Sequence, residues 1–165
     1  MAEAQKNVGI NQSTLLSAIT GKLDVYVLPL WQKKMLLPQG AVAEIISASQ
    51  LKATKKNTSV GLLGQVTWEG EPLPVISFEA FNGDNSAPAP QKLAIVVAAN
   101  LGEEHTHYAL ALQAEPTLNK IKIAEIEDLD HATTGAMEYL QVKYQNNLCV
   151  IPELDALEAK LKSLL

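Results

Sequence analysis

Arginine is absent from this chain, and all 13 of its basic residues are lysines. Specific contacts to bases and phosphates depend heavily on the guanidinium group, because its planar fork of donors binds two acceptors at once. A chain without arginine is therefore not expected to bind nucleic acid or to transfer phosphoryl groups.

Cysteine and long apolar runs are also scarce. The one cysteine, Cys149, lies in the apolar run 148–151 and cannot form an internal disulfide, which is typical of a reducing compartment. The longest apolar runs, such as 93–99, are far shorter than the roughly 20 residues of a membrane-spanning helix. Residues 1–14 lack the apolar stretch of a secretory signal. We therefore expect a cytoplasmic protein that does not insert into membranes.

The chain does have enough apolar residues for a folded core. Its 165 residues are 47% hydrophobic and 19% charged, which indicates a globular protein. The net charge of −5 is unevenly spread, since residues 1–90 carry seven lysines and seven carboxylates whereas residues 91–165 carry six lysines and eleven carboxylates. The acidic second half predicts either a solvated acidic face or an acidic docking face for a partner.

Short apolar segments separated by glycine, proline and polar residues run through the chain, a pattern typical of β-strands. After Pro152, which suits the first turn of a helix, leucines recur at helical spacing. On this helix Glu158 and Lys162 are expected to pair on the exposed side. The predicted fold class is mostly β, of barrel type, with a C-terminal helix. The expected strands are 23–30, 41–47, 61–68, 73–78, 92–100, 107–113, 121–126, 136–142 and 148–151, with a candidate short helix at 14–20.

A β-hairpin is predicted at residues 61–81, where two apolar strands flank Glu69 and Gly70. Glycine at the second turn position supplies the positive φ that a tight turn needs. Pro72 and Pro74 follow the turn, and because proline cannot donate to a sheet ladder, this strand is expected at an edge or a barrel rim. The turn pair fits either a purely structural role or an exposed contact for a partner.

Residues 82–91 form the clearest change in composition, with Gly, Asn, Asp, Ser and two prolines and no large apolar side chain. They are predicted to be a linker between two halves. An N-terminal segment, 1–22, would then precede a single domain, 23–165. The domain would contain a first barrel at roughly 23–81, a second at roughly 92–151 and a helix at 152–165, with strands free to exchange between the barrels.

One cluster of candidate metal ligands is present, formed by Glu103, Glu104, His105 and His107. On a strand the two histidines would share a face, and imidazoles with a nearby carboxylate can hold a metal. No further ligand follows at a recognisable spacing, so an exposed hairpin tip is the preferred interpretation. A ligand- or metal-binding barrel is the alternative.

The sequence shows no motif of an active site. Gly61 to Gly64 lack the following lysine and hydroxyl residue of a phosphate loop, and neither G-x-S-x-G nor H-E-x-x-H occurs. We therefore expect no catalytic residues, no metal and no cofactor, with a dispersed hydrolase or transferase site as a further alternative.

Three segments resemble the CheW family, the adaptor proteins of bacterial chemosensory arrays. In that family a glycine leads to an Asn-Leu-Arg-Gly-like turn and then a strand with Pro-Val; Gly64, the turn 67–70 and the strand 74–78 take those places here. The segment 41–46 is similar to the family's Val-x-Glu-Val segment, and 148–157 is similar to its closing strand and helix start. The run LPLWQKKMLLPQGAVAEII is similar to the ChpC adaptors of type IV pilus chemosensory systems.

The resemblance implies a CheW-like fold of two small SH3-like β-barrels around a shared core. It also implies a non-catalytic adaptor that links the regulatory domain of a CheA-type histidine kinase to the cytoplasmic tips of methyl-accepting chemoreceptors. One barrel face would dock on the kinase, and an apolar groove between the barrels would take a receptor helix. The ChpC resemblance implies control of twitching motility.

The family pattern, read together with the hairpin, indicates the candidate partner-binding residues Val42, Glu44, Trp68, Glu69 and Gly70. The turn arginine that the family links to partner contacts is Glu69 here, while the usual asparagine is Thr67 and the Asp after Pro-Val is Ser77. A reversed charge at an exposed turn repels an acidic partner side chain, so we expect an altered kinase or receptor surface. Trp68 is expected to cap a barrel end or to anchor a partner, and Val42 to be a core residue or a contact residue.

Overall fold

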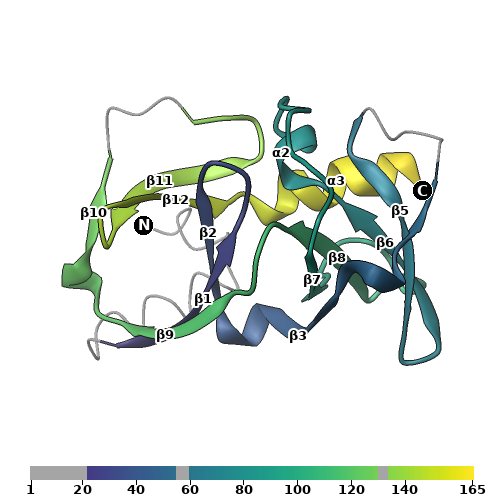
Figure 1. Cartoon of the computed structure of the whole chain (residues 1–165), viewed down its shortest axis with the longest axis horizontal. Coiled ribbons are helices and arrows are strands. Elements are labelled where there is room, and N and C mark those ends of the chain that lie inside the picture. Colours follow the sequence, from purple (N-terminus) through teal and green to yellow (C-terminus); the bar gives the residue numbers. More distant parts are fainter. Residues whose placement is uncertain (1–21, 55–59, 130–133) are drawn as a thin grey trace.

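The computed structural model describes residues 22–54, 60–129 and 134–165 and shows a mostly β protein (Figure 1). The strands are β1 (Leu23–Pro29), β2 (Lys34–Pro38), β3 (Val42–Ser47), β4 (Lys52–Ala53), β5 (Leu62–Trp68), β6 (Glu71–Ile76), β7 (Lys92–Val97), β8 (His107–Leu112), β9 (Thr117–Ile121), β10 (Ile126–Asp128), β11 (Glu138–Tyr144) and β12 (Asn147–Pro152). The helices are α2 (Phe78–Phe81) and α3 (Leu154–Leu164), with 3₁₀ turns η2 (Gln39–Ala41), η3 (Ala48–Gln50) and η5 (Ile123–Glu125). The candidate helix at 14–20 lies outside the described residues. Within the described residues, neither α2 nor α3 has the length and apolar character needed to cross a membrane.

The strands form two six-stranded sheets that lie side by side in Figure 1. Sheet 1 has the order β10-β11-β12-β2-β1-β9, and sheet 2 has the order β3-β7-β8-β6-β5-β4. The sheets do not follow the division expected at residues 82–91, because that segment joins α2 to β7 within sheet 2. Sheet 1 instead combines both ends of the described chain, since β12 pairs in parallel with β2. The strands are therefore exchanged between the two expected halves.

Both sheets curl until strands that are not neighbours touch. In sheet 2 the Trp68 Nε1–H of β5 donates to Glu44 Oε1 of β3 at 2.9 Å. In sheet 1 Asn119 Nδ2 of β9 donates to the Tyr144 hydroxyl of β11, also at 2.9 Å. In a flat sheet β3 and β5 would lie about 19 Å apart, four strand spacings. These contacts give each sheet the barrel form that the sequence predicts.

Three apolar clusters hold the structure together, one inside each sheet and one between the sheets. Alternate residues of β7 belong to two different clusters. Leu93 and Ile95 pack inside sheet 2, whereas Val96 packs between the sheets. Leu157 and Leu161 of α3 complete the central cluster. Strands covered on both faces read as continuous apolar runs, which is why β7 shows no polar alternation.

The predicted hairpin is confirmed. Trp68 of β5 pairs with Glu71 of β6, and Glu69 and Gly70 form the two-residue turn between them with φ angles of 49° and 80°. Both turn residues are in the left-handed region that a tight hairpin turn requires.

The two prolines lie where β6 has a single neighbour. β6 pairs with β5 along its length but meets β8 only from Val75 onward, so Pro72 and Pro74 precede the second ladder, as expected of a rim strand. The strand ends earlier than expected because the Ser77 hydroxyl accepts the Ala80 N–H and begins α2.

The strand expected at 121–126 is broken in two. β9 ends at Ile121 and β10 begins at Ile126, with η5 between them. Glu125 Oε1 accepts the Lys122 N–H at 2.8 Å and stabilises this break, which leaves Ile123 58% exposed. Alternation of apolar residues does not distinguish one continuous strand from two strands joined by a single 3₁₀ turn.

Glu158 does not lie on the exposed side of α3, contrary to the expectation from helical spacing. It is 1% exposed, and its Oε1 accepts the N–H groups of Ala99 at 3.0 Å and Asn100 at 2.8 Å. Its Oε2 accepts the hydroxyl of Tyr108 at 3.2 Å. The pKa of Tyr108 is raised well above its usual value, mainly by burial and secondarily by the negative charge of Glu158. The carboxylate therefore ties α3 to the β7–β8 loop, and two backbone donors take the place of a lysine partner.

Replacing Glu158 by alanine is expected to lower the free energy of unfolding by about 2 kcal/mol, because it removes the acceptor of three hydrogen bonds. Glu158→Gln, which keeps an acceptor oxygen, should lose less. Urea unfolding measures both, with Glu127→Ala on exposed β10 as a control. Equal midpoints for Glu158→Ala and the control would show that the carboxylate does not hold the loop.

Candidate functional site

Residues from four strands, β3, β5, β7 and β8, meet at one end of sheet 2. The indole of Trp68 donates to Glu44, as described above, and its ring lies 4.8 Å from the His107 ring, measured between centroids, at an interplanar angle of 52°. Val97 pairs with His107 across β7 and β8. We call Glu44, Trp68, Val97 and His107 the barrel-end cluster.

Strand alternation places these four residues together. Each lies two positions from a residue that packs inside sheet 2, and residues two apart on a strand face the same side. The four side chains therefore face the same side as the apolar residues inside sheet 2. They lie at the end of the barrel, beyond the last of those apolar residues. The corresponding inner residues are Ile46, Val66, Ile95 and Ala109.

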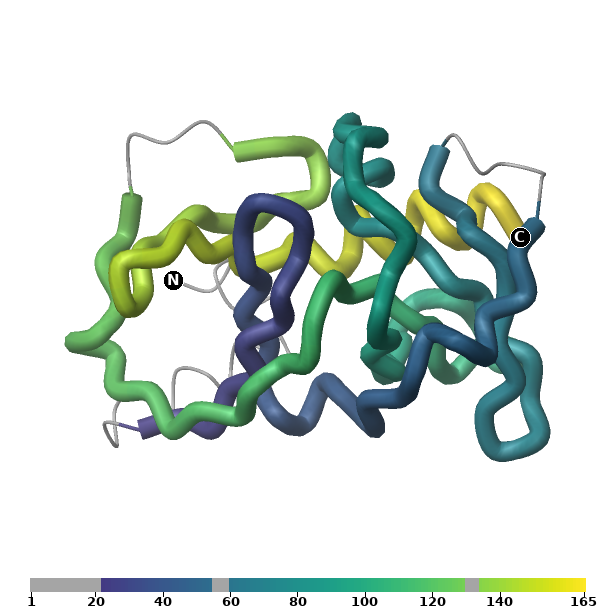
Figure 2. The backbone as a smooth tube through the Cα atoms, viewed as in Figure 1, coloured from purple at the N-terminus to yellow at the C-terminus, as the bar shows by residue number. Residues whose placement is uncertain are grey.

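The barrel-end cluster contains apolar and aromatic side chains next to the carboxylate of Glu44. Val97 is 45% exposed, Trp68 and His107 are half-buried, and Glu44 is exposed. The β5–β6 turn with Glu69 continues directly from Trp68 and projects away from the rest of sheet 2 (Figure 2). The arrangement can bind a partner surface, and among the residues that the structure describes it brings no acid–base pair to a closed cavity.

The structure brings together four of the five predicted partner-binding residues, namely Glu44, Trp68, Glu69 and Gly70. Val42 lies apart, because it is 8% exposed and packs in the central cluster between the sheets. A bulge between Val42 and Glu44 shifts the alternation of β3, so the two side chains face opposite sides although they are two residues apart. Val42 therefore offers little surface to a partner.

Sequence reasoning missed Val97 as a member of the cluster and considered His107 only as a metal ligand. The available signal was alternation, since both residues continue the inward-facing positions of apolar strands. His107 opens β8, whereas His105 lies in the β7–β8 loop. This loop is a hairpin connection, as preferred from the sequence. Within residues 22–54, 60–129 and 134–165, no group of three or more His, Cys, Asp or Glu side chains could hold a metal ion.

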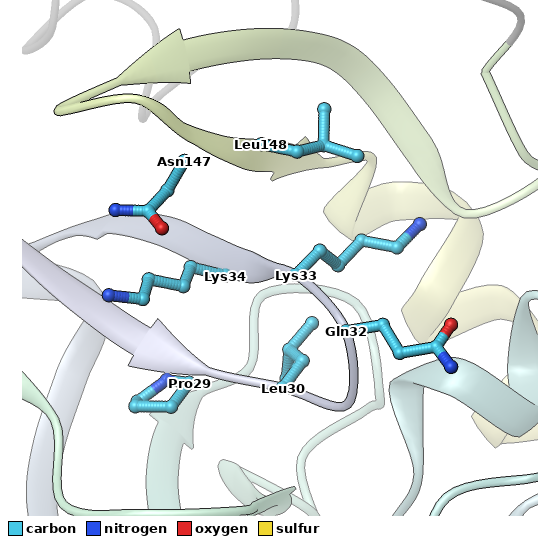
Figure 3. A pocket seen from close by; sticks show the side chains of 7 residues that line it. All are labelled: Pro29, Leu30, Gln32, Lys33, Lys34, Asn147 and Leu148. Carbon is cyan, nitrogen blue, oxygen red and sulfur yellow. The ribbon is translucent and has the colours of Figure 1, made fainter.

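A pocket of about 250 Å³ lies elsewhere, between the β1–β2 turn and the start of β12 (Figure 3). In this view Lys34 and Asn147 extend in one direction, and Gln32 and Lys33 extend in the other. Its titratable lining residues are the two lysines, so this pocket offers no acid–base pair. Its lining consists of Pro29, Leu30, Gln32, Lys33, Lys34, Asn147 and Leu148, with none of the predicted partner-binding residues.

Lys33 belongs to a buried network around Glu138, whose side chain is 1% exposed. The carboxylate accepts from Lys33 Nζ at 2.8 Å, Asn82 Nδ2 at 2.7 Å, the Gly135 N–H at 2.9 Å and Gln141 Nε2 at 2.6 Å. Burial alone would raise the pKa of Glu138, but the hydrogen bonds and the Lys33 charge outweigh it and lower the pKa to about 2. This Glu138 node joins the β1–β2 turn, the end of α2 and β11, which makes it a structural site.

Comparison with known proteins confirms the resemblance drawn from the hairpin. The CheW-like domain family matches residues 25–160, a range that includes both sheets and the barrel-end cluster. The crystal structure of the scaffolding protein TtCheW from Thermoanaerobacter tengcongensis is similar in fold, with a TM-score of 0.62 and 17% sequence identity over 79% of this chain and 88% of that chain. No curated protein sequence matches the chain significantly. The chain therefore belongs to the CheW-like domain family.

Proposed function

We propose that this protein is a non-catalytic adaptor that couples a CheA-type histidine kinase to chemoreceptors in a bacterial chemosensory pathway. The observation that carries the proposal is the match of residues 25–160 to the CheW-like domain family. One solved structure of similar fold is that of a scaffolding protein. The similarity of residues 28–46 to ChpC adaptors supports a role in a type IV pilus chemosensory system that controls twitching motility. The protein would act in the cytoplasm.

The barrel-end cluster is the proposed contact with the kinase regulatory domain. It combines a tryptophan and an exposed valine beside the projecting β5–β6 turn, and interfaces are enriched in aromatic anchors surrounded by polar residues. The receptor tip would bind a separate surface, for which the face between the two sheets is the expected place. Signal would pass as a shift in how often each contact is made, without chemistry in this chain.

Isothermal titration with the kinase regulatory domain and with a receptor cytoplasmic fragment from the same genome tests the proposal. We expect saturable binding to both, and kinase autophosphorylation that responds to the receptor fragment only when this protein is present. If the protein fails to bind the kinase domain, or fails to bind the receptor fragment, at low salt, the adaptor function is overturned.

Glu69→Arg tests whether the turn takes part in this contact. Reversing the charge is expected to change the Kd for the kinase domain about tenfold at low salt and much less at high salt, because exposed charges are screened by salt. Both side chains face the same left-handed backbone strain at this position, so folding should be unaffected. Glu127→Arg, on exposed β10 of sheet 1, is the matched control. Equal binding by the two variants at all salt concentrations would assign the turn a structural role alone.

A further inference from the structure

Glu44 of the barrel-end cluster and the carboxylates of the neighbouring hairpin form no ion pair with a lysine of the described residues. Glu44 uses Oε1 to accept the Trp68 indole, and its Oε2 has no hydrogen-bond partner among the described residues. Glu69 and Glu71 are exposed on the hairpin beside Trp68. The ion pairs within the described residues, which join Lys33 to Glu138, Lys92 to Glu115 and Lys120 to Asp24, involve none of these three carboxylates.

The aromatic part of the cluster is held in a fixed orientation. The hydrogen bond to Glu44 and the contact with the His107 ring restrain the Trp68 side chain from two sides. Trp68 also packs against the apolar cluster inside sheet 2. Trp68 is thus restrained beside a carboxylate whose second oxygen has no partner among the described residues. This arrangement suits a planar cation, because a guanidinium can stack on the ring and pair with the carboxylate at the same time.

Building on the proposed function, we infer that the barrel-end cluster takes an arginine side chain of the kinase regulatory domain, stacked on Trp68 and paired with Glu44 and the hairpin carboxylates Glu69 and Glu71. Arginine fits better than lysine because its flat, delocalised charge is weakly hydrated and presents paired donors. The contact would determine specificity, because a partner with an acidic residue at this point would meet uncompensated carboxylates.

The chain's lack of arginine makes a direct test possible. Phenylglyoxal modifies arginine side chains. This protein has none, so the arginines that the reagent modifies all belong to the kinase domain. We expect treatment of the kinase regulatory domain to weaken its binding to the wild-type protein at least tenfold, whereas acetylation of its lysines should change the Kd less than threefold.

Glu44→Gln shows whether the modified arginine is the one at the barrel end. Glutamine keeps an acceptor for the Trp68 indole and removes only the charge, and Glu127→Gln is the matched control. The variant should bind the untreated kinase domain about tenfold more weakly than wild type. Phenylglyoxal treatment of the kinase domain should then raise the Kd for the variant by much less than tenfold. In an NMR titration of the wild-type protein, the Trp68 indole signal should shift while that of Trp31 stays in place.

Several results would overturn this inference and leave the adaptor function standing. Among them are binding of Glu44→Gln with wild-type affinity, an equal phenylglyoxal effect on both proteins, and a greater loss on lysine acetylation. In each case the kinase domain still binds, but the partner's arginine is not at Glu44. Failure of the untreated kinase domain to bind the wild-type protein would instead remove the proposed function and this inference together.

Discussion

Replacing Glu138 by alanine is expected to lower the free energy of unfolding by about 3–5 kcal/mol at neutral pH, one of the two largest effects we predict. The change removes the acceptor shared by Lys33, Asn82, Gly135 and Gln141 and leaves the partly buried ammonium of Lys33 without its counter-ion. Breaking one side of a buried ion pair costs far more than the pair contributes relative to an apolar replacement. Chemical denaturation at pH 7 measures this loss.

The same node predicts a pH dependence with a defined sign. Glu138 has its pKa lowered from 4.5 to about 2 in the folded protein. A lowered folded-state pKa gives stability that is present above about pH 4.5 and is lost as the pH falls toward 2. The difference in unfolding free energy between wild type and Glu138→Gln should therefore shrink steadily between pH 5 and pH 2. A difference that stays constant over this range would mean that the Glu138 charge does not stabilise the fold.

A surface pair provides the comparison for this node. Lys92 and Glu115 lie 3.1 Å apart, with side chains that are 35% and 65% exposed. Exposed pairs contribute about 0–1 kcal/mol, so Glu115→Ala should change stability little. A loss at Glu115 equal to that at Glu138 would show that burial does not set the strength of these ion pairs.

Features fixed by neighbouring residues could be predicted from the sequence. The β5–β6 hairpin follows from Glu69 and Gly70 between two apolar runs, because the turn conformation depends on the turn residues themselves. The rim position of Pro72 and Pro74 follows from an equally local property, the missing N–H of proline. The C-terminal helix was predictable for the same reason, since its leucine spacing lies within one element.

Features that depend on distant pairing could not be predicted. The pairing of β12 with β2 joins segments from opposite ends of the chain, and the composition of residues 82–91 carries no information about it. Glu158 is buried because the β7–β8 loop presents two N–H groups to it, which the helical pattern of α3 does not reveal. The residue pattern within one strand likewise does not determine which group forms a hydrogen bond with each buried polar side chain.

The candidate site shows the same division. Glu44 and Trp68 were each identified from their own segments, but their hydrogen bond arises only because sheet 2 curls. The bulge in β3 turned Val42 away from them, and one inserted residue cannot be read from a strand pattern. Val97 and His107 joined the site through their place at the end of β7 and β8, which depends on the register between strands.

Gly64→Ala is the second substitution with a large expected effect, a loss of about 3 kcal/mol in the free energy of unfolding. A Cβ at this position would overlap the carbonyl of Lys52, and would lie 2.8 Å from its carbonyl carbon and 2.9 Å from the Cα of Ala53. These are backbone atoms of β4, which pairs with β5 through Ala53 and Gly64, so no side-chain rotation relieves the overlap. Gly40→Ala is the matched control, since nothing lies within 4 Å of its added Cβ, and we expect less than about 0.5 kcal/mol there.

The protein can respond to Gly64→Ala in two ways that hydrogen exchange distinguishes. If β4 detaches, the Thr54 amide, which donates to the Leu63 carbonyl at 3.0 Å, should lose its protection while the remaining strands keep theirs. If β4 stays in place, the whole of sheet 2 must absorb the overlap, and its amides should lose protection together. Unchanged stability with an unchanged Thr54 amide would contradict the predicted close approach of the two strands. Because β5 also carries Trp68, the second response should weaken partner binding at the barrel-end cluster, whereas Gly40→Ala should leave it intact.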